Sequence, residues 1–82
     1  SENGLAIYPN PAADEFTVDC GKSPASGSII LTDILGNQAL RRELSMPSQR
    51  VTIGTSTLPS GVYTVQVWLG NQLHTERIVI SR

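Results

Sequence analysis

The sequence is poor in the residue types that most often carry chemistry: one cysteine, one histidine, one tryptophan, two tyrosines and one phenylalanine among 82 residues. A single cysteine excludes an internal disulfide and any metal site built from several thiolates. Because Cys20 alternates with Phe16 and Val18, we expect it to be a small buried hydrophobe and not a reactive thiol. Catalysis by His74 would require a nucleophile, and no nucleophile motif accompanies it. We therefore expect no catalytic residue and no enzymatic activity.

Long apolar runs and concentrated charge are also absent. No apolar stretch approaches the roughly 18–20 residues that cross a bilayer. The net charge is −1, and Arg41-Arg42 is the only adjacent basic pair, so no nucleic-acid partner is expected. Asp14, Glu15, Asp19 and Asp33 lack the spacing of a calcium loop, and no glycine-rich phosphate loop occurs. The sequence therefore predicts neither a metal site nor a cofactor.

The length and composition allow one folded domain. A chain of 82 residues has room for a single core, and 39% apolar with 16% charged residues is unlike a disordered tail. Residues 1–4 are polar and lack the charged and apolar regions of a signal peptide. We expect 1–4 to be a linker or processing segment and 5–82 to be the domain. If the protein is exported, another part of a longer precursor would carry the targeting signal.

Short alternating segments separated by turn residues make up the rest of the chain, without a helical period. We expect strands at 5–8, 15–20, 28–34, 37–44, 50–53, 62–69 and 72–81. Turn signals about every 8–12 residues predict an all-β, immunoglobulin-like β-sandwich of about seven antiparallel strands. The apolar run 29–31 indicates a central strand. Segment 62–69 should turn alternate residues from Tyr63 to Leu69 inward and Trp68 outward.

Several turns are predicted by their residue types. Pro9 and Pro11 lack an N–H donor and should end the first strand. The Asp33 carboxylate should accept a hydrogen bond from the backbone N–H two residues later, and Gly36 should adopt the left-handed conformation of a type I turn with a bulge. Gly70 should begin a two-residue hairpin connection with positive φ.

Four motifs occur in a recognisable order. They are Tyr8-Pro9-Asn10-Pro11-Ala12, Asp33-Ile34-Leu35-Gly36, the segment Leu58-Pro59-Ser60-Gly61-Val62-Tyr63-Thr64-Val65, and the terminal Ile78-Val79-Ile80. Over nearly the whole chain, from Leu5 to Arg82, this arrangement resembles the C-terminal sorting domain of type IX secretion system cargo. One departure is that Arg77 and Arg82 flank the last strand where the family commonly has lysine. Arginine keeps the charge but not the geometry of an ammonium group.

The resemblance implies a role in export. Such domains follow a passenger protein, which crosses the periplasm and is carried through the outer membrane by translocon and shuttle proteins. A sortase-like cysteine peptidase at the surface then removes the domain, which performs no chemistry itself. The residues that the resemblance marks for recognition are Tyr8, Pro9, Asn10, Pro11, Asp33, Gly36, Gly61, Tyr63, Arg77, Ile78, Val79, Ile80 and Arg82.

Some of these motif residues are also expected to have a role in the fold itself. We expect Gly61 to supply a conformation or close approach that a Cβ would block, and Tyr63 to pack inward with its hydroxyl satisfied at the rim. The terminal strand, 78–82, is expected to be an exposed edge that a receptor could bind by strand addition. It could equally pair with a second copy, as a dimer or with swapped strands.

Two other classes remain open at this point. An adhesion or carbohydrate-binding sandwich appended to an extracellular enzyme would need a cluster of exposed aromatic side chains, for which Trp68 alone is thin support. A structural spacer without a receptor predicts that deleting the domain leaves export intact.

Overall fold

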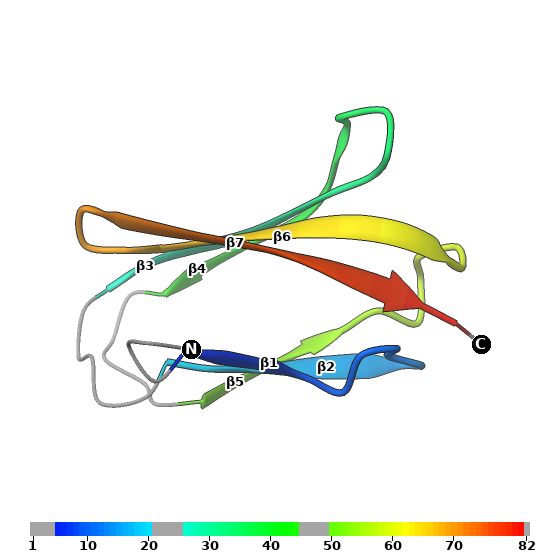
Figure 1. Ribbon diagram of the computed structural model, residues 1–82, viewed down its shortest axis with the longest axis horizontal. Coiled ribbons are helices and arrows are strands. Elements are labelled where there is room, and N and C mark those ends of the chain that lie inside the picture. The colour runs from blue at the N-terminus through cyan, green and yellow to red at the C-terminus, as the bar shows by residue number, and fades with distance from the viewer. Residues whose placement is uncertain (1–4, 21–25, 45–49, 82) are drawn as a thin grey trace.

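The computed structural model describes residues 5–20, 26–44 and 50–81, which form seven strands in two facing sheets (Figure 1). The three-stranded sheet has the order β1 (Ala6–Tyr8), β2 (Glu15–Asp19), β5 (Arg50–Gly54). The four-stranded sheet has the order β4 (Gln38–Leu44), β3 (Gly27–Thr32), β6 (Gly61–Leu69), β7 (Gln72–Ile80). All paired strands are antiparallel. The predicted all-β sandwich of about seven strands is confirmed.

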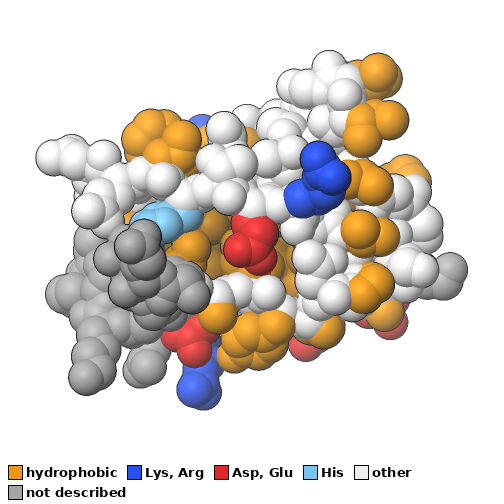
Figure 2. All heavy atoms as spheres, viewed as in Figure 1, with side chains coloured by type: hydrophobic (Ala, Val, Ile, Leu, Met, Phe, Trp, Pro, Cys, Tyr) orange, Lys and Arg blue, Asp and Glu red, His pale blue; other side chains and the backbone are white. Residues whose placement is uncertain are grey.

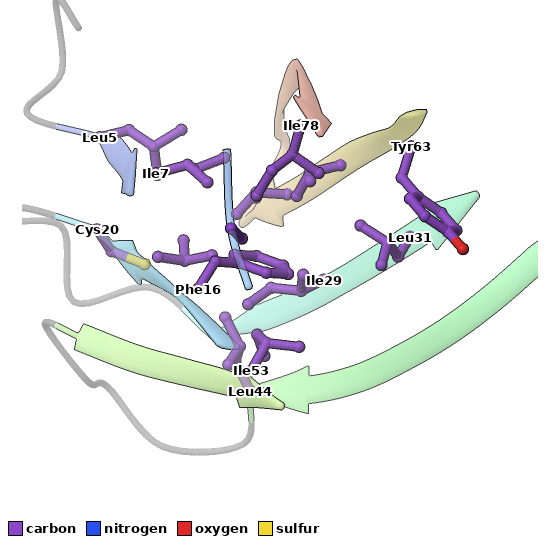
Figure 3. Packing of buried hydrophobic residues seen from close by; sticks show 14 of the residues in the cluster. Leu5, Ile7, Phe16, Cys20, Ile29, Leu31, Leu44, Ile53, Tyr63 and Ile78 are labelled. Carbon is purple, nitrogen blue, oxygen red and sulfur yellow. The ribbon is translucent and has the colours of Figure 1, made fainter. Parts of the chain in front are cut away.

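The core lies between the two sheets (Figure 3), and burial follows a period of two along β2, β5 and β6. In β6, alternate residues from Tyr63 to Leu69 are buried, whereas Val62 and Trp68 are exposed on the outer face. The side chains of Phe16 in β2 and Ile29 in β3 are fully buried. Because a strand turns successive side chains to opposite faces, one apolar face per strand suffices to build this core.

Strand β3 is central, as its apolar run predicted, because β4 and β6 pair with its two edges. Ile29 and Leu31 face the core and are fully buried, while Ile30 on the outer face is only partly buried. The strand ends at Thr32, two residues earlier than expected, because Asp33 already belongs to the following turn. The predicted loop 45–49 lies outside the described residues.

The glycine that the fold requires at a close approach is Gly27, not Gly61. A Cβ at Gly27 would lie 1.7 Å from the backbone oxygen of Trp68, where β3 and β6 meet. A Cβ at Gly61 would meet only the Tyr63 ring, at 3.9 Å, which is an ordinary contact. Positive φ occurs among the described glycines at Gly36 and Gly70, so Gly61 needs no left-handed backbone either. The expectation for Gly61 was wrong.

We predict that Gly27→Ala lowers the free energy of unfolding by about 1–3 kcal/mol, because the strands must separate to admit a methyl group. Gly61→Ala should leave it unchanged or raise it by up to about 1 kcal/mol, since a Cβ fits there and the unfolded chain loses freedom. Urea unfolding of both variants compares the two sites. A larger loss at Gly61 than at Gly27 would contradict this account.

Candidate functional site

The first motif is a corner by which the chain passes from one sheet to the other. Strand β1 pairs with β2, and the corner segment, defined here as residues 9–12, then reaches β7 of the opposite sheet. Ala12 forms a parallel bridge with Ile80: its N–H donates to the Val79 oxygen at 2.7 Å, and its oxygen accepts from the Ser81 N–H at 2.8 Å. The peptide bonds that precede the two prolines of the motif are both cis.

The Asn10 side chain completes this pairing. Its Nδ2 donates to the backbone oxygen of Arg77 at 3.0 Å, and its Oδ1 accepts from the Val79 N–H at 3.0 Å. A side-chain amide carries one acceptor and two donors, so it can bond an open strand edge as a peptide group would. The corner segment therefore joins the first and last motifs, which are 67–69 residues apart in the chain.

This contact corrects the expectation of an exposed terminal edge. The N–H and the C=O of Val79 both point away from β6, and both are hydrogen-bonded to the corner segment. In an antiparallel pair such outward groups alternate along the strand. The corner segment therefore covers the β7 edge at 78–80. The stretch of this edge that it leaves uncovered lies around Leu73 and Thr75. Arg82, the last residue marked for recognition, lies outside the described residues.

The connection that precedes the third motif is bonded to residues 13 and 14, which follow the corner segment. Thr55 is fully buried; its N–H donates to the Asp14 oxygen at 2.7 Å, and its Oγ1 donates to the Ala13 oxygen at 3.1 Å. Four residues before Tyr63, the Pro59 oxygen accepts from the Tyr63 hydroxyl at 2.7 Å, which confirms that this ring packs inward with its hydroxyl satisfied. Sequence reasoning missed Thr55, because a threonine in a polar connection carries no signal of such a contact.

The second motif forms the turn between β3 and β4 as predicted. Oδ1 of Asp33 accepts from the N–H groups of Leu35 and Asn37, both at 2.9 Å. The Gly36 N–H donates to the Asp33 oxygen at 3.0 Å, and Gly36 has φ of 87°. Ile34 and Leu35 at the tip are each 80% exposed, whereas the other exposed large hydrophobics among the described residues are 39–43% exposed.

These segments gather at one end of the sandwich, which we call the motif end. It carries the corner segment, the connection 55–60, the turn 33–36 and the C-terminal end of β7 (Figure 1). Strand pairing agrees with this view: Gly61 lies opposite Ile80, and Thr32, which precedes the turn, lies opposite Thr64. Figure 2 shows hydrophobic side chains exposed along this end. Motifs scattered over the sequence thus lie towards one end of the sandwich, from which the turn 33–36 projects.

Within the described segments, no group of three or more His, Cys, Asp and Glu side chains could hold a metal ion. The same segments contain no helix long and apolar enough to cross a membrane. Burial, with a smaller effect of the Asp19 charge, raises the pKa of the Cys20 thiol, so it stays protonated at neutral pH. The exposed aromatic rings Tyr8 and Trp68 belong to different sheets, which does not favour a carbohydrate platform.

The fold places the chain among immunoglobulin-like β-sandwiches. It superimposes on the crystal structure of a DUF3244 family protein of this fold from Bacteroides vulgatus with a TM-score of 0.83, covering 98% of this chain and 87% of the other. The two sequences are 13% identical, so the likeness concerns the fold alone. Among curated proteins, none matches the chain.

The family is shown by the sequence itself. The model of the secretion system C-terminal sorting domain matches residues 6–81, and the chain belongs to this family. It is a sorting domain of secreted cargo, a non-catalytic class whose task implies contact with secretion machinery.

We predict that Asn10→Ala lowers the free energy of unfolding by about 1–2 kcal/mol, because two hydrogen bonds are lost. Asn10→Asp should cost at least as much, since a carboxylate oxygen would replace the donor that faces the Arg77 carbonyl. Hydrogen exchange gives the specific readout: the Val79 amide should exchange faster in both variants. Unchanged protection at Val79 would show that the Asn10 contact does not hold this edge.

Proposed function

We propose that this chain is a folded export signal that directs a passenger protein across the outer membrane by the type IX secretion system. A sortase-like cysteine peptidase at the cell surface then removes it. The observation that supports this is the gathering of all four motifs at the motif end of one sandwich. A receptor that binds this end would contact several segments of the chain at once.

A folded signal explains why the motifs are spread along the sequence. Asn10 and Val79 are hydrogen-bonded across a separation of 69 residues, so neither segment has its surface without the other. Such a signal exists only once the domain has folded, which suits a cargo that folds in the periplasm before it is carried outward. Translocon and shuttle proteins of the outer membrane are the partners proposed for this surface.

The first prediction of this proposal is that residues 1–82 suffice for sorting. Fused behind a periplasmic reporter in a strain with a type IX system, they should carry the reporter to the cell surface, where protease accessibility and surface labelling measure it. The control is the same fusion in a strain that lacks the translocon. A folded, intact fusion retained in the periplasm would refute the proposal.

The second prediction concerns removal of the domain. A peptidase needs an accessible backbone, and residues 1–4 are polar and precede β1 in the sequence. Leu5 and Ile7 are buried, and Ile7 pairs with Val18, so a cut beyond Ile7 would remove β1 from its sheet. We expect mass spectrometry of the released domain to place the cut within 1–4 or shortly upstream. A mature N-terminus beyond Ile7 would contradict this.

A further inference from the structure

We propose that Ile34 and Leu35, at the tip of the β3–β4 hairpin, insert into an apolar pocket of an outer-membrane component of the export machinery. The inference rests on the proposed function and names the contact that it would use. At 80% exposure these two side chains differ from every other large hydrophobic residue among those described. Neighbouring apolar side chains exposed together are typical of interaction sites.

The fold does not need an apolar tip. The turn is closed by Asp33, whose carboxylate takes the N–H groups of Leu35 and Asn37, and by Gly36 with its positive φ. Ile34 and Leu35 contribute backbone to this turn, while their side chains lie in water. Polar side chains would serve the turn equally well and would lower the risk of aggregation. A role outside the domain accounts for two large aliphatic residues at this point.

The backbone conformation of the turn is also fixed before any partner binds. The Asp33 N–H donates to the Asn37 oxygen at 2.9 Å, and with the Gly36 N–H bond to Asp33 this closes the tip into a compact loop. A segment whose backbone is already fixed loses little conformational entropy when a partner binds it. Oδ1 of Asp33 accepts both of its hydrogen bonds from within the turn, so the side chains at the tip itself are two aliphatic ones, Ile34 and Leu35. An apolar pocket matches this chemistry.

The shape of the tip decides between possible partners. Figure 1 shows the β3–β4 hairpin projecting away from the rest of the sandwich, and Figure 2 shows hydrophobic side chains at its end. A projecting tip requires a hollow partner surface. In a two-fold dimer a second copy would present the same projection there, and two projections are not complementary to each other. The proposed occupant is therefore a concave apolar site on another protein, and the sorting role implies contact with proteins of the secretion machinery.

The test uses the reporter fusion with the double substitution Ile34→Ser/Leu35→Ser. Surface delivery should fall by about tenfold or more, while the melting temperature of the purified chain changes by no more than about 3 °C. Ile34→Met/Leu35→Met keeps the tip apolar and should retain export. The matched control is Trp68→Thr/Leu73→Thr, a cross-strand pair outside the four motifs, which removes exposed apolar surface on the outer face of the four-stranded sheet and should also retain export.

The outcomes separate this inference from the proposed function. If the unsubstituted fusion stays in the periplasm, the sorting role itself fails. If it reaches the surface and the serine variant does so equally well, sorting stands and the tip contact is refuted. Equal losses in the serine variant and the control would also refute it, because any exposed apolar surface would then matter.

A second measurement does not depend on how the serine variant folds. A photo-crosslinking amino acid at Leu35 should capture an outer-membrane protein in cells, and the same group at Gln72, on the opposite end of β7, should not. Crosslinks only to another copy of the chain would show that the tip mediates self-association. Either that result or no crosslink during active export overturns the proposal.

Discussion

The outer edge of β7 is the constraint on which the other features depend. A sandwich of two open sheets leaves backbone donors and acceptors at each edge, and such edges pair readily with other chains. Here the Asn10 amide and the Ala12 backbone take up the groups of Arg77, Val79 and Ser81. This pairing closes the C-terminal half of the edge and fixes the corner segment across the two sheets. It also makes the first and last motifs one structural unit.

The prolines of the first motif fit this arrangement. Pro9 and Pro11 have no N–H, so the pairing with β7 falls to the side chain of Asn10 and the backbone of Ala12 between and after them. The same prolines end β1 after three residues and prevent it from continuing along β2. The first motif thus has a direct structural role, because it turns the chain from one sheet to the other.

Structural features that depend on residues close together in the sequence were predicted correctly. Features that depend on residues far apart in the sequence were missed. Alternation along 62–69 and the Asp33 turn were correct, because the bonds of Asp33 reach at most four residues along the chain. The close approach at Gly27 was missed, and it was assigned wrongly to Gly61, because it arises where Gly27 passes the Trp68 carbonyl. The edge at 78–80 was called exposed, because no local pattern reveals that Asn10 covers it.

At the motif end, some residues that a receptor could contact also stabilise the fold, and others do not. Asn10 and Ile78 cannot be changed without altering the sheet edge or the core, so a loss of export in such variants leaves folding as an explanation. The tip of the β3–β4 turn is different, because Ile34 and Leu35 make no contribution to the buried core. Their side chains can change while Asp33 and Gly36 keep the turn closed. At the tip of this turn, therefore, a receptor contact can be distinguished from a requirement of the fold.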